Sequence, residues 1–103
     1  KRLVEEALAF EQAGAFSILL EGTLSNVASE ITRQVRVPVV GIGSGVDVDG
    51  QVLVWSDMLG FFEDFKPKFV KRYLDGAALV RKGVQEYASE VKSKIFPSSE
   101  FCY

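Results

Sequence analysis

The sequence predicts an α/β fold built on parallel strands, and three observations indicate it. Two apolar runs, residues 16–20 and 39–43, are bounded by glycine or proline, as is typical of strands buried on both faces. A segment with helical spacing of apolar residues precedes each run, over residues 1–13 and 23–35. A third apolar run follows at residues 51–55. Helices alternating with strands through short links are the pattern of parallel crossover units.

Length and composition limit the possible functions. The 103 residues make at most one small domain, and 48% hydrophobic with 25% charged residues is typical of a globular protein. A net charge of −2 argues against nucleic acid as a partner, because phosphate binding draws on clustered Lys and Arg. The lack of His excludes Ser-His-Asp and Cys-His nucleophiles. The single Cys102 predicts a reducing compartment such as the cytoplasm, and no apolar run is long enough to span a membrane.

Three helices are predicted from the spacing of apolar residues. The first covers residues 1–13, and Gly14 is placed to end it. The second runs to about Val35 from one of three candidate capping residues, which are Thr23, Ser25 and Asn26. Its buried stripe is expected to contain Leu24, Val27, Ala28, Ile31 and Val35. The third runs from about Asp75 to Lys94, and the aromatic tail after it is expected to dock on the rest of the chain.

The segment that follows the second predicted strand is harder to interpret. Its link to the third strand is too short for a helical crossover, so a hairpin is the local interpretation. Asp57 is expected to be the N-cap of the next element rather than a reactive carboxylate. A cluster of aromatic residues needs a covering surface, and its members are Phe61, Phe62, Phe65 and Phe69. The nearby basic residues are interpreted as a solvated helix face, formed by Lys66, Lys68, Lys71 and Arg72.

The first apolar run ends in a carboxylate, Glu21, followed directly by Gly22. The C-terminal end of a parallel strand is where ligands bind in open α/β sheets and in α/β barrels. Partial desolvation at such an edge raises the pKa of a carboxyl group, which can then act as a base near neutral pH. Glu21 is therefore a candidate general base. A solvated loop glutamate, or one paired with a neighbouring cation, is the alternative.

A glycine-rich turn, residues 41–45, ends the second apolar run. Glycine there allows a ligand or a neighbouring backbone to approach closely, and exposed N–H groups in a turn can hold an anion. Gly43 and Ser44 are therefore candidates for substrate binding, with a tight turn that binds nothing as the alternative. The spacing is not a dinucleotide fingerprint, because no helix follows. Residues 47–58 match a calcium loop too poorly for us to assign calcium, because the twelfth position is Met58.

The predicted strands do not form a complete sheet. Both outer edges would be unpaired and apolar, which favours aggregation. The chain also begins within a helical pattern and without Met, which indicates a fragment or a cleaved product. We therefore expect more sheet beside these strands.

Several motifs together resemble the ketopantoate hydroxymethyltransferase family, also called 3-methyl-2-oxobutanoate hydroxymethyltransferase. They occur in the family's order over essentially the whole chain, at residues 15–21, 37–45, 49–54, 57–60, 67–73 and 96–97. The resemblance implies that residues 1–103 are a single partial domain, the C-terminal part of a (β/α)8 TIM barrel with its last three strands. The N-terminal strands would be absent, and the short link would be a reduced last crossover.

The resemblance also implies an activity. The family transfers a hydroxymethyl group from 5,10-methylenetetrahydrofolate to 3-methyl-2-oxobutanoate, giving ketopantoate for pantothenate and coenzyme A biosynthesis, and it uses Mg²⁺. Glu21 matches the family's proposed proton acceptor at C3 of the oxo acid. The metal ligands and a substrate lysine belong to earlier strands, so this chain holds no metal ligand and is expected to be inactive alone. Its partners would be the oxo acid, the folate, the N-terminal part of the barrel and further copies in a homo-oligomer.

Two departures and two alternatives accompany this interpretation. Ser56 stands where many relatives have His, and Phe101-Cys102 replaces an ending that contains His. Another Mg²⁺-dependent barrel enzyme on 2-oxo acids, of the phosphoenolpyruvate mutase or lyase type, would fit Glu21 but leave residues 49–54 and 67–73 unexplained. The second alternative is a half-barrel without catalysis. It would dimerise through its strand edges and bind a partner through its Phe-rich segment.

Overall fold

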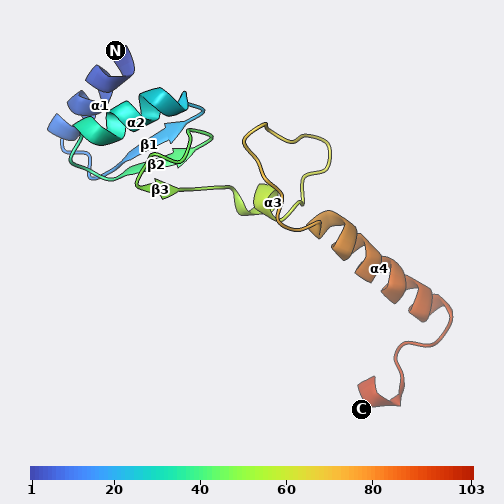
Figure 1. Ribbon diagram of the computed structural model, residues 1–103. Helices are drawn as coiled ribbons and strands as arrows, with labels where there is room; N and C mark the ends of the chain where they lie inside the picture. Colours follow the sequence, from blue (N-terminus) through green and yellow to red (C-terminus); the bar gives the residue numbers. More distant parts are fainter. The chain divides into compact units, whose positions relative to one another are not determined.

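The computed structural model describes all 103 residues, which form two compact units. The first unit comprises residues 1–54 and 67–71, and the second comprises residues 55–66 and 72–103. The elements, labelled in Figure 1, are α1 (Arg2–Gln12), β1 (Ile18–Glu21), α2 (Ser25–Gln34), β2 (Val39–Ile42), β3 (Gly50–Gln51), α3 (Trp55–Met58), α4 (Gly76–Lys92) and the 3₁₀ turn η1 (Ser99–Phe101). None of the helices combines the length and the apolar character needed to traverse a lipid bilayer.

The first unit contains a three-stranded sheet of order β1-β2-β3, in which both pairs are parallel. Ile18 lies opposite Val39 and Glu21 opposite Ile42, so β1 and β2 end at the same level. β3 runs parallel to β2, so the hairpin interpretation is wrong, although the connection between them, residues 43–49, contains no helix. Gly43 and Gly45 both have positive φ, which lets the chain reverse within this short link.

The third strand is shorter than predicted. It contains only Gly50–Gln51, although the Val52 N–H extends the pairing by donating to the Gly41 carbonyl over 3.0 Å. Trp55 begins α3 instead of ending a strand, and its ring packs edge-on against Phe61 at 5.5 Å between centroids. This contact outweighs the strand preference of an aromatic residue. Asp57 consequently lies inside α3 and is not an N-cap, which corrects that prediction.

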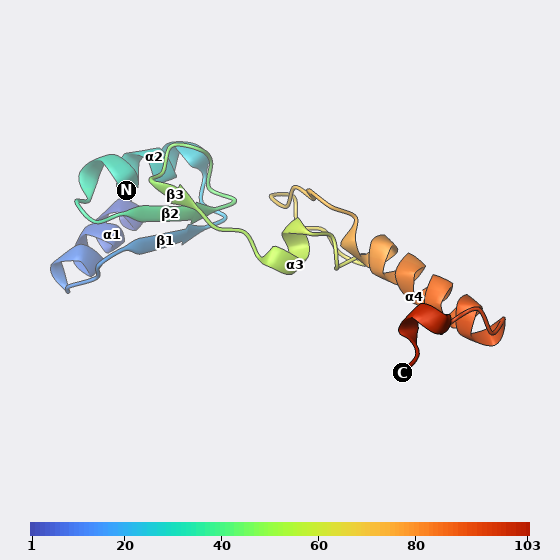
Figure 2. The ribbon, with the colours of Figure 1, turned by 90° about the horizontal axis from the view of Figure 1, so that it is seen from below.

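The core of the first unit lies between α1, α2 and one face of the sheet (Figure 2). Ala28, Ile31 and Val39 are completely buried there. Because side chains alternate along a strand, β1 turns Ile18 and Leu20 into this core and leaves Leu19 and Glu21 on the other face. Leu19 is 60% exposed, so the prediction of burial on both faces is wrong for this chain. Its helices cover only one side of the sheet.

The helix ends agree in part with the sequence predictions. α1 ends as predicted, since Gly14 has φ of +96° and the N–H groups of Gly14 and Ala15 bind the last-turn carbonyls. α2 begins after Leu24, and no side chain caps it, so the three candidate caps are wrong. Leu24 is exposed and does not join the predicted stripe, whereas Ala28 and Ile31 are buried.

The second unit is built around α4 and lacks a buried core. Its only buried residues are Gly60 and Gly76. The tail docks on α4 as expected, with Phe96 against Tyr87 at 5.5 Å and against Phe101 at 5.7 Å between ring centroids.

The basic residues between 66 and 72 lie in irregular chain and not on a helix, which corrects their interpretation as a helix face.

Candidate functional site

Glu21 is the last residue of β1, and it lies on the sheet face that the helices leave open. Its side chain is exposed, and the carboxylate makes no hydrogen bond or ion pair within the chain. The desolvation expected from the sequence is therefore not supplied by the elements of this chain. What the chain fixes is the position of the Glu21 backbone, at the C-terminal edge of a parallel sheet, where such folds bind ligands.

The turn after Glu21 is held by hydrogen bonds to the end of β2. The Gly22 N–H donates to the Ile42 carbonyl over 2.9 Å, which continues the strand pairing by one residue. The Thr23 N–H donates to the Ser44 hydroxyl oxygen over 3.2 Å. That hydroxyl in turn lies 2.9 Å from the Leu20 carbonyl oxygen and 3.2 Å from that of Ile42, and it can donate its proton to either.

The glycine turn is explained by close packing within the first unit. A Cβ on Gly43 would lie 2.8 Å from Cγ of Phe69, and one on Gly45 would lie 2.6 Å from Cβ of Ser25. The chain itself therefore requires glycine at both positions. Ser44, between them, is only 1% exposed. The assignment of Gly43 and Ser44 to substrate binding stays a prediction, and the structure adds a structural use for each.

Two open grooves lie beside this edge of the sheet. One, of about 420 Å³, runs past the ends of β1 and β2 and includes Gly22, Ser25, Gly43, Lys68 and Phe69. The other, of about 220 Å³, follows the outer edge of β1 and includes Glu21, Leu19 and residues of α1. The Glu21 groove is mostly apolar and opens beside a strand with no partner on that side.

The carboxylates of this chain do not form a large cluster. No three Asp, Glu, Cys or His side chains gather in a group that could hold a metal ion. Mg²⁺ requires oxygen ligands in near-octahedral geometry, commonly from one or two carboxylates together with water or substrate. Two other acidic residues near the strands bind backbone amides. Asp49 accepts the Val39 N–H over 2.8 Å, and Glu11 accepts the N–H groups of Arg36 and Val37 over 2.5 and 3.2 Å.

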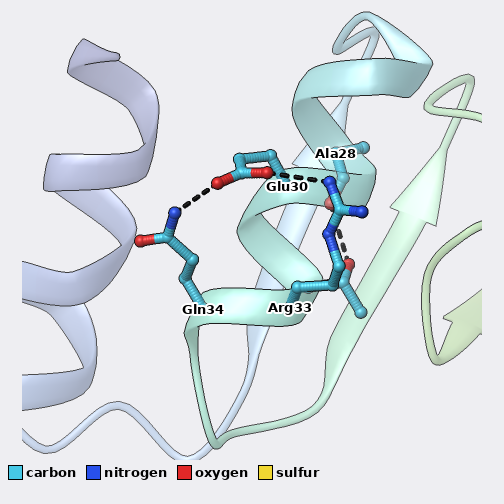
Figure 3. Close-up of polar contacts among 5 residues, drawn as sticks. Ala28, Glu30, Arg33 and Gln34 are labelled. Atoms are coloured by element: carbon cyan, nitrogen blue, oxygen red, sulfur yellow. Dashed lines mark hydrogen bonds and ion pairs between the residues drawn. The ribbon is translucent and has the colours of Figure 1, made fainter.

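The polar contacts of α2 form a separate cluster on its exposed side (Figure 3). Glu30 accepts hydrogen bonds from Gln34 and from Arg33, the latter over 2.8 Å. These bonds, first from Gln34 and then from Arg33, lower the pKa of Glu30 below its ordinary value of 4.5. This cluster is a solvated helix surface, with no connection to the edge that carries Glu21.

Comparison with known proteins identifies the family. Residues 1–99 match the family described as ketopantoate hydroxymethyltransferase. The chain belongs to this family. It is 94% identical over all 103 residues to the 3-methyl-2-oxobutanoate hydroxymethyltransferase of Campylobacter concisus, and 74% identical to that of Campylobacter curvus. A more distant relative of the same name, from Helicobacter hepaticus, is 50% identical over 103 residues.

The chain is much shorter than these family members. It spans 38% of the length of the two Campylobacter relatives and 39% of the Helicobacter protein. The relatives are named as transferases, and this chain corresponds to only part of each. The open face of the sheet and the apolar groove along β1 are therefore features of a segment of such a protein.

Sequence reasoning identified Glu21 but missed how its position is fixed. A serine between two glycines after a strand suggested a ligand contact, and nothing in the sequence indicated a hydroxyl directed at the backbone on both sides of residue 21. The structural roles of Glu11 and Asp49 were missed for the same reason, since their partners are backbone amides brought close by the fold.

Proposed function

We propose that this chain is the C-terminal segment of an enzyme that transfers a hydroxymethyl group from 5,10-methylenetetrahydrofolate to 3-methyl-2-oxobutanoate, with Glu21 as the general base. The observation that carries the proposal is the place of Glu21 on the uncovered face of a parallel sheet, at the C-terminal end of its strand. In a (β/α)8 barrel the helices lie outside, so the face without helices is the interior. Active sites of such barrels lie at the C-terminal ends of the strands.

The proposed barrel also explains the exposed apolar groups of the first unit. Leu19 and the groove along β1 would be covered by strands from the N-terminal part of the full-length protein. That covering would remove Glu21 from bulk water, as its proposed role requires. The family membership and the 38% coverage support this arrangement, because the relatives are long enough to supply the remaining strands.

The chemistry assigned to this chain is a single proton transfer. The C3–H bond of the oxo acid breaks, the proton moves to a carboxylate oxygen of Glu21, and the electron pair is delocalised onto the 2-oxo group as an enolate. The enolate carbon is then the nucleophile toward the one-carbon unit of the folate; both C–N bonds of that unit break in the transfer, water supplies the hydroxyl oxygen, and tetrahydrofolate leaves. The Mg²⁺ used by the family would need ligands from the N-terminal part, since this chain offers no cluster to hold it. We assign it no step here. A general base of this kind contributes about 10²–10⁴-fold to the rate.

The test is Glu21→Gln in the full-length protein, which retains the shape of the side chain and removes the base. We expect exchange of the C3 hydrogen of 3-methyl-2-oxobutanoate in deuterated water to fall by about 10²-fold or more. Proton NMR follows it directly, because the methyl doublet collapses to a singlet as C3 takes up deuterium. Glu30→Gln is the matched control, since Glu30 lies in the exposed cluster on α2, and it should exchange at the wild-type rate. Unchanged exchange in Glu21→Gln would refute the base assignment.

A further inference from the structure

The Ser44 hydroxyl makes contacts on both sides of Glu21 in the sequence. It lies 2.9 Å from the carbonyl oxygen of Leu20, the residue before Glu21, and it accepts the N–H of Thr23, two residues after it, over 3.2 Å. A hydroxyl has one proton to donate and two lone pairs that accept, so both bonds can form at once. The Leu20 carbonyl oxygen, at 2.9 Å, is a nearer acceptor for the Ser44 proton than the Ile42 carbonyl oxygen, at 3.2 Å.

The surroundings make this arrangement rigid. Ser44 is 1% exposed, so water does not compete for its hydroxyl. Gly43 and Gly45, with φ of +62° and +87°, place it there, and Phe69 and Ser25 pack where their Cβ atoms would be. A buried hydroxyl of this kind is costly to leave unpaired, which holds the chain at residues 20–23 against the end of β2.

Glu21 needs such support because nothing in this chain holds its side chain. The carboxylate makes no hydrogen bond or ion pair here, so the chain fixes only the position of the Glu21 backbone from which the side chain projects. Gly22, with φ of +59°, would otherwise leave the turn free to rotate. Small displacements of a catalytic group lower the reaction rate strongly, since a shift of about 1 Å can reduce it by about 10²-fold.

We propose that Ser44 is a positioning residue that fixes the backbone position of Glu21 by hydrogen bonding the chain before and after it. This inference rests on the proposed role of Glu21 as the base. It gives Ser44 a function through Glu21 and assigns it no contact with the substrate. Ser44 therefore affects proton removal, measured by kcat, and not binding of the oxo acid, measured by KM.

The test uses the full-length protein and the same exchange of the C3 hydrogen. Ser44→Ala should lower kcat for exchange by about 10- to 100-fold and leave KM for 3-methyl-2-oxobutanoate within about twofold. Ser44→Cys fills the same space with a weaker hydrogen-bonding group, so its kcat should lie between those of the wild type and Ser44→Ala. This variant can still test the inference if the alanine variant fails to fold. Ser44→Thr keeps the hydroxyl and should recover most of the activity. The matched control is Thr32→Val, which removes a side-chain bond to the Ala28 carbonyl on α2 and should leave kcat unchanged.

Combining the changes separates a positioning role from general damage. If Ser44 acts through Glu21, then Ser44→Ala should change the remaining exchange of Glu21→Gln by less than about twofold, because the two effects are not additive. A raised KM with unchanged kcat in Ser44→Ala would show a substrate contact and overturn the inference, as would wild-type kinetics. A loss in Glu21→Gln without a loss in Ser44→Ala refutes the positioning role alone. Wild-type exchange in Glu21→Gln refutes the proposed function itself.

Discussion

The two units of this chain differ in how they bury apolar side chains. In the first unit, Ala28, Ile31 and Val39 are fully buried between two helices and a sheet. In the second, α4 carries an apolar stripe at helical spacing whose members stay 44–61% exposed, namely Val80, Val84, Tyr87 and Val91. Both segments have the composition of ordinary globular chain, so composition does not explain the difference.

The difference shows which interactions are local in the sequence. The first unit closes its core within residues 1–54, because consecutive helices and strands of a crossover unit pack against each other. α4 contacts only the aromatic tail at Tyr87, and most of its apolar stripe stays exposed. Because helices in proteins gain most of their stability from packing of an apolar face, α4 is the less stabilised of the two regions.

The largest expected effect tests this contrast directly in the 103-residue chain. Ile31→Ala removes a completely buried side chain and should cost about 2–5 kcal/mol of unfolding free energy. Val84→Ala removes a comparable apolar group from the exposed stripe of α4 and should change stability by less than about 0.5 kcal/mol. Urea unfolding followed by circular dichroism measures both. Equal losses would show that a second surface covers α4 in solution and would break the comparison.

Replacing one glycine of each unit by alanine compares how tightly the two units pack around the backbone. Gly43 in the first unit has φ of +62°, and a Cβ there would lie 2.8 Å from Phe69, so Gly43→Ala should cost about 1–3 kcal/mol. Gly83 in α4 has no atom within 4 Å of its Cβ position, so Gly83→Ala should stabilise the helix by about 0.5–1 kcal/mol. The midpoints of urea unfolding should therefore move in opposite directions. A gain from Gly43→Ala would show that this turn is not strained.

The smallest expected effect concerns Glu30, on the exposed side of the well-packed unit. Its pKa is lowered in the folded state, so it stabilises the fold above the unfolded value of 4.5, and this contribution is lost as the pH falls through the folded pKa. On acidification through that range, the wild type should lose slightly more thermal stability than Glu30→Gln, by roughly 1 °C in Tm. If Tm falls with pH equally in the two proteins, Glu30 does not stabilise the fold through its lowered pKa.

Much of the first unit could be predicted from the sequence. Helical spacing located α1 and α2, and apolar runs located β1 and β2 within a few residues. The predictions failed where distant residues decide the outcome. Trp55 begins α3, and its ring packs against the distant Phe61. α2 begins after Leu24 without a capping side chain, and the Thr23 N–H binds the distant Ser44.

The sequence located the candidate site residue, Glu21, but did not predict the contacts and exposure of its side chain. Glu21 was found because a carboxylate directly after an apolar run is recognisable in a sequence. The sequence left open whether Glu21 is partly desolvated or solvated, because the pattern of a strand buried on both faces does not say which chain segment covers the second face. The parallel course of β3 was also unexpected from the residues, since glycine-rich chain replaced the helix that normally makes the return.

The link between β2 and β3 has a consequence for how the protein tolerates changes in length. Beyond the C-terminal end of β2, Ser44 hydrogen bonds the Leu20 carbonyl. At the N-terminal end of β2, the Asp49 carboxylate accepts the Val39 N–H. The five steps between them reach about 17 Å at most, while the return along β2 and across to the next strand uses about 11–14 Å. Surface loops usually absorb deletions readily. Removal of two residues would shorten this reach to about 10 Å and break one of these two hydrogen-bonded attachments, so the length of this loop is constrained.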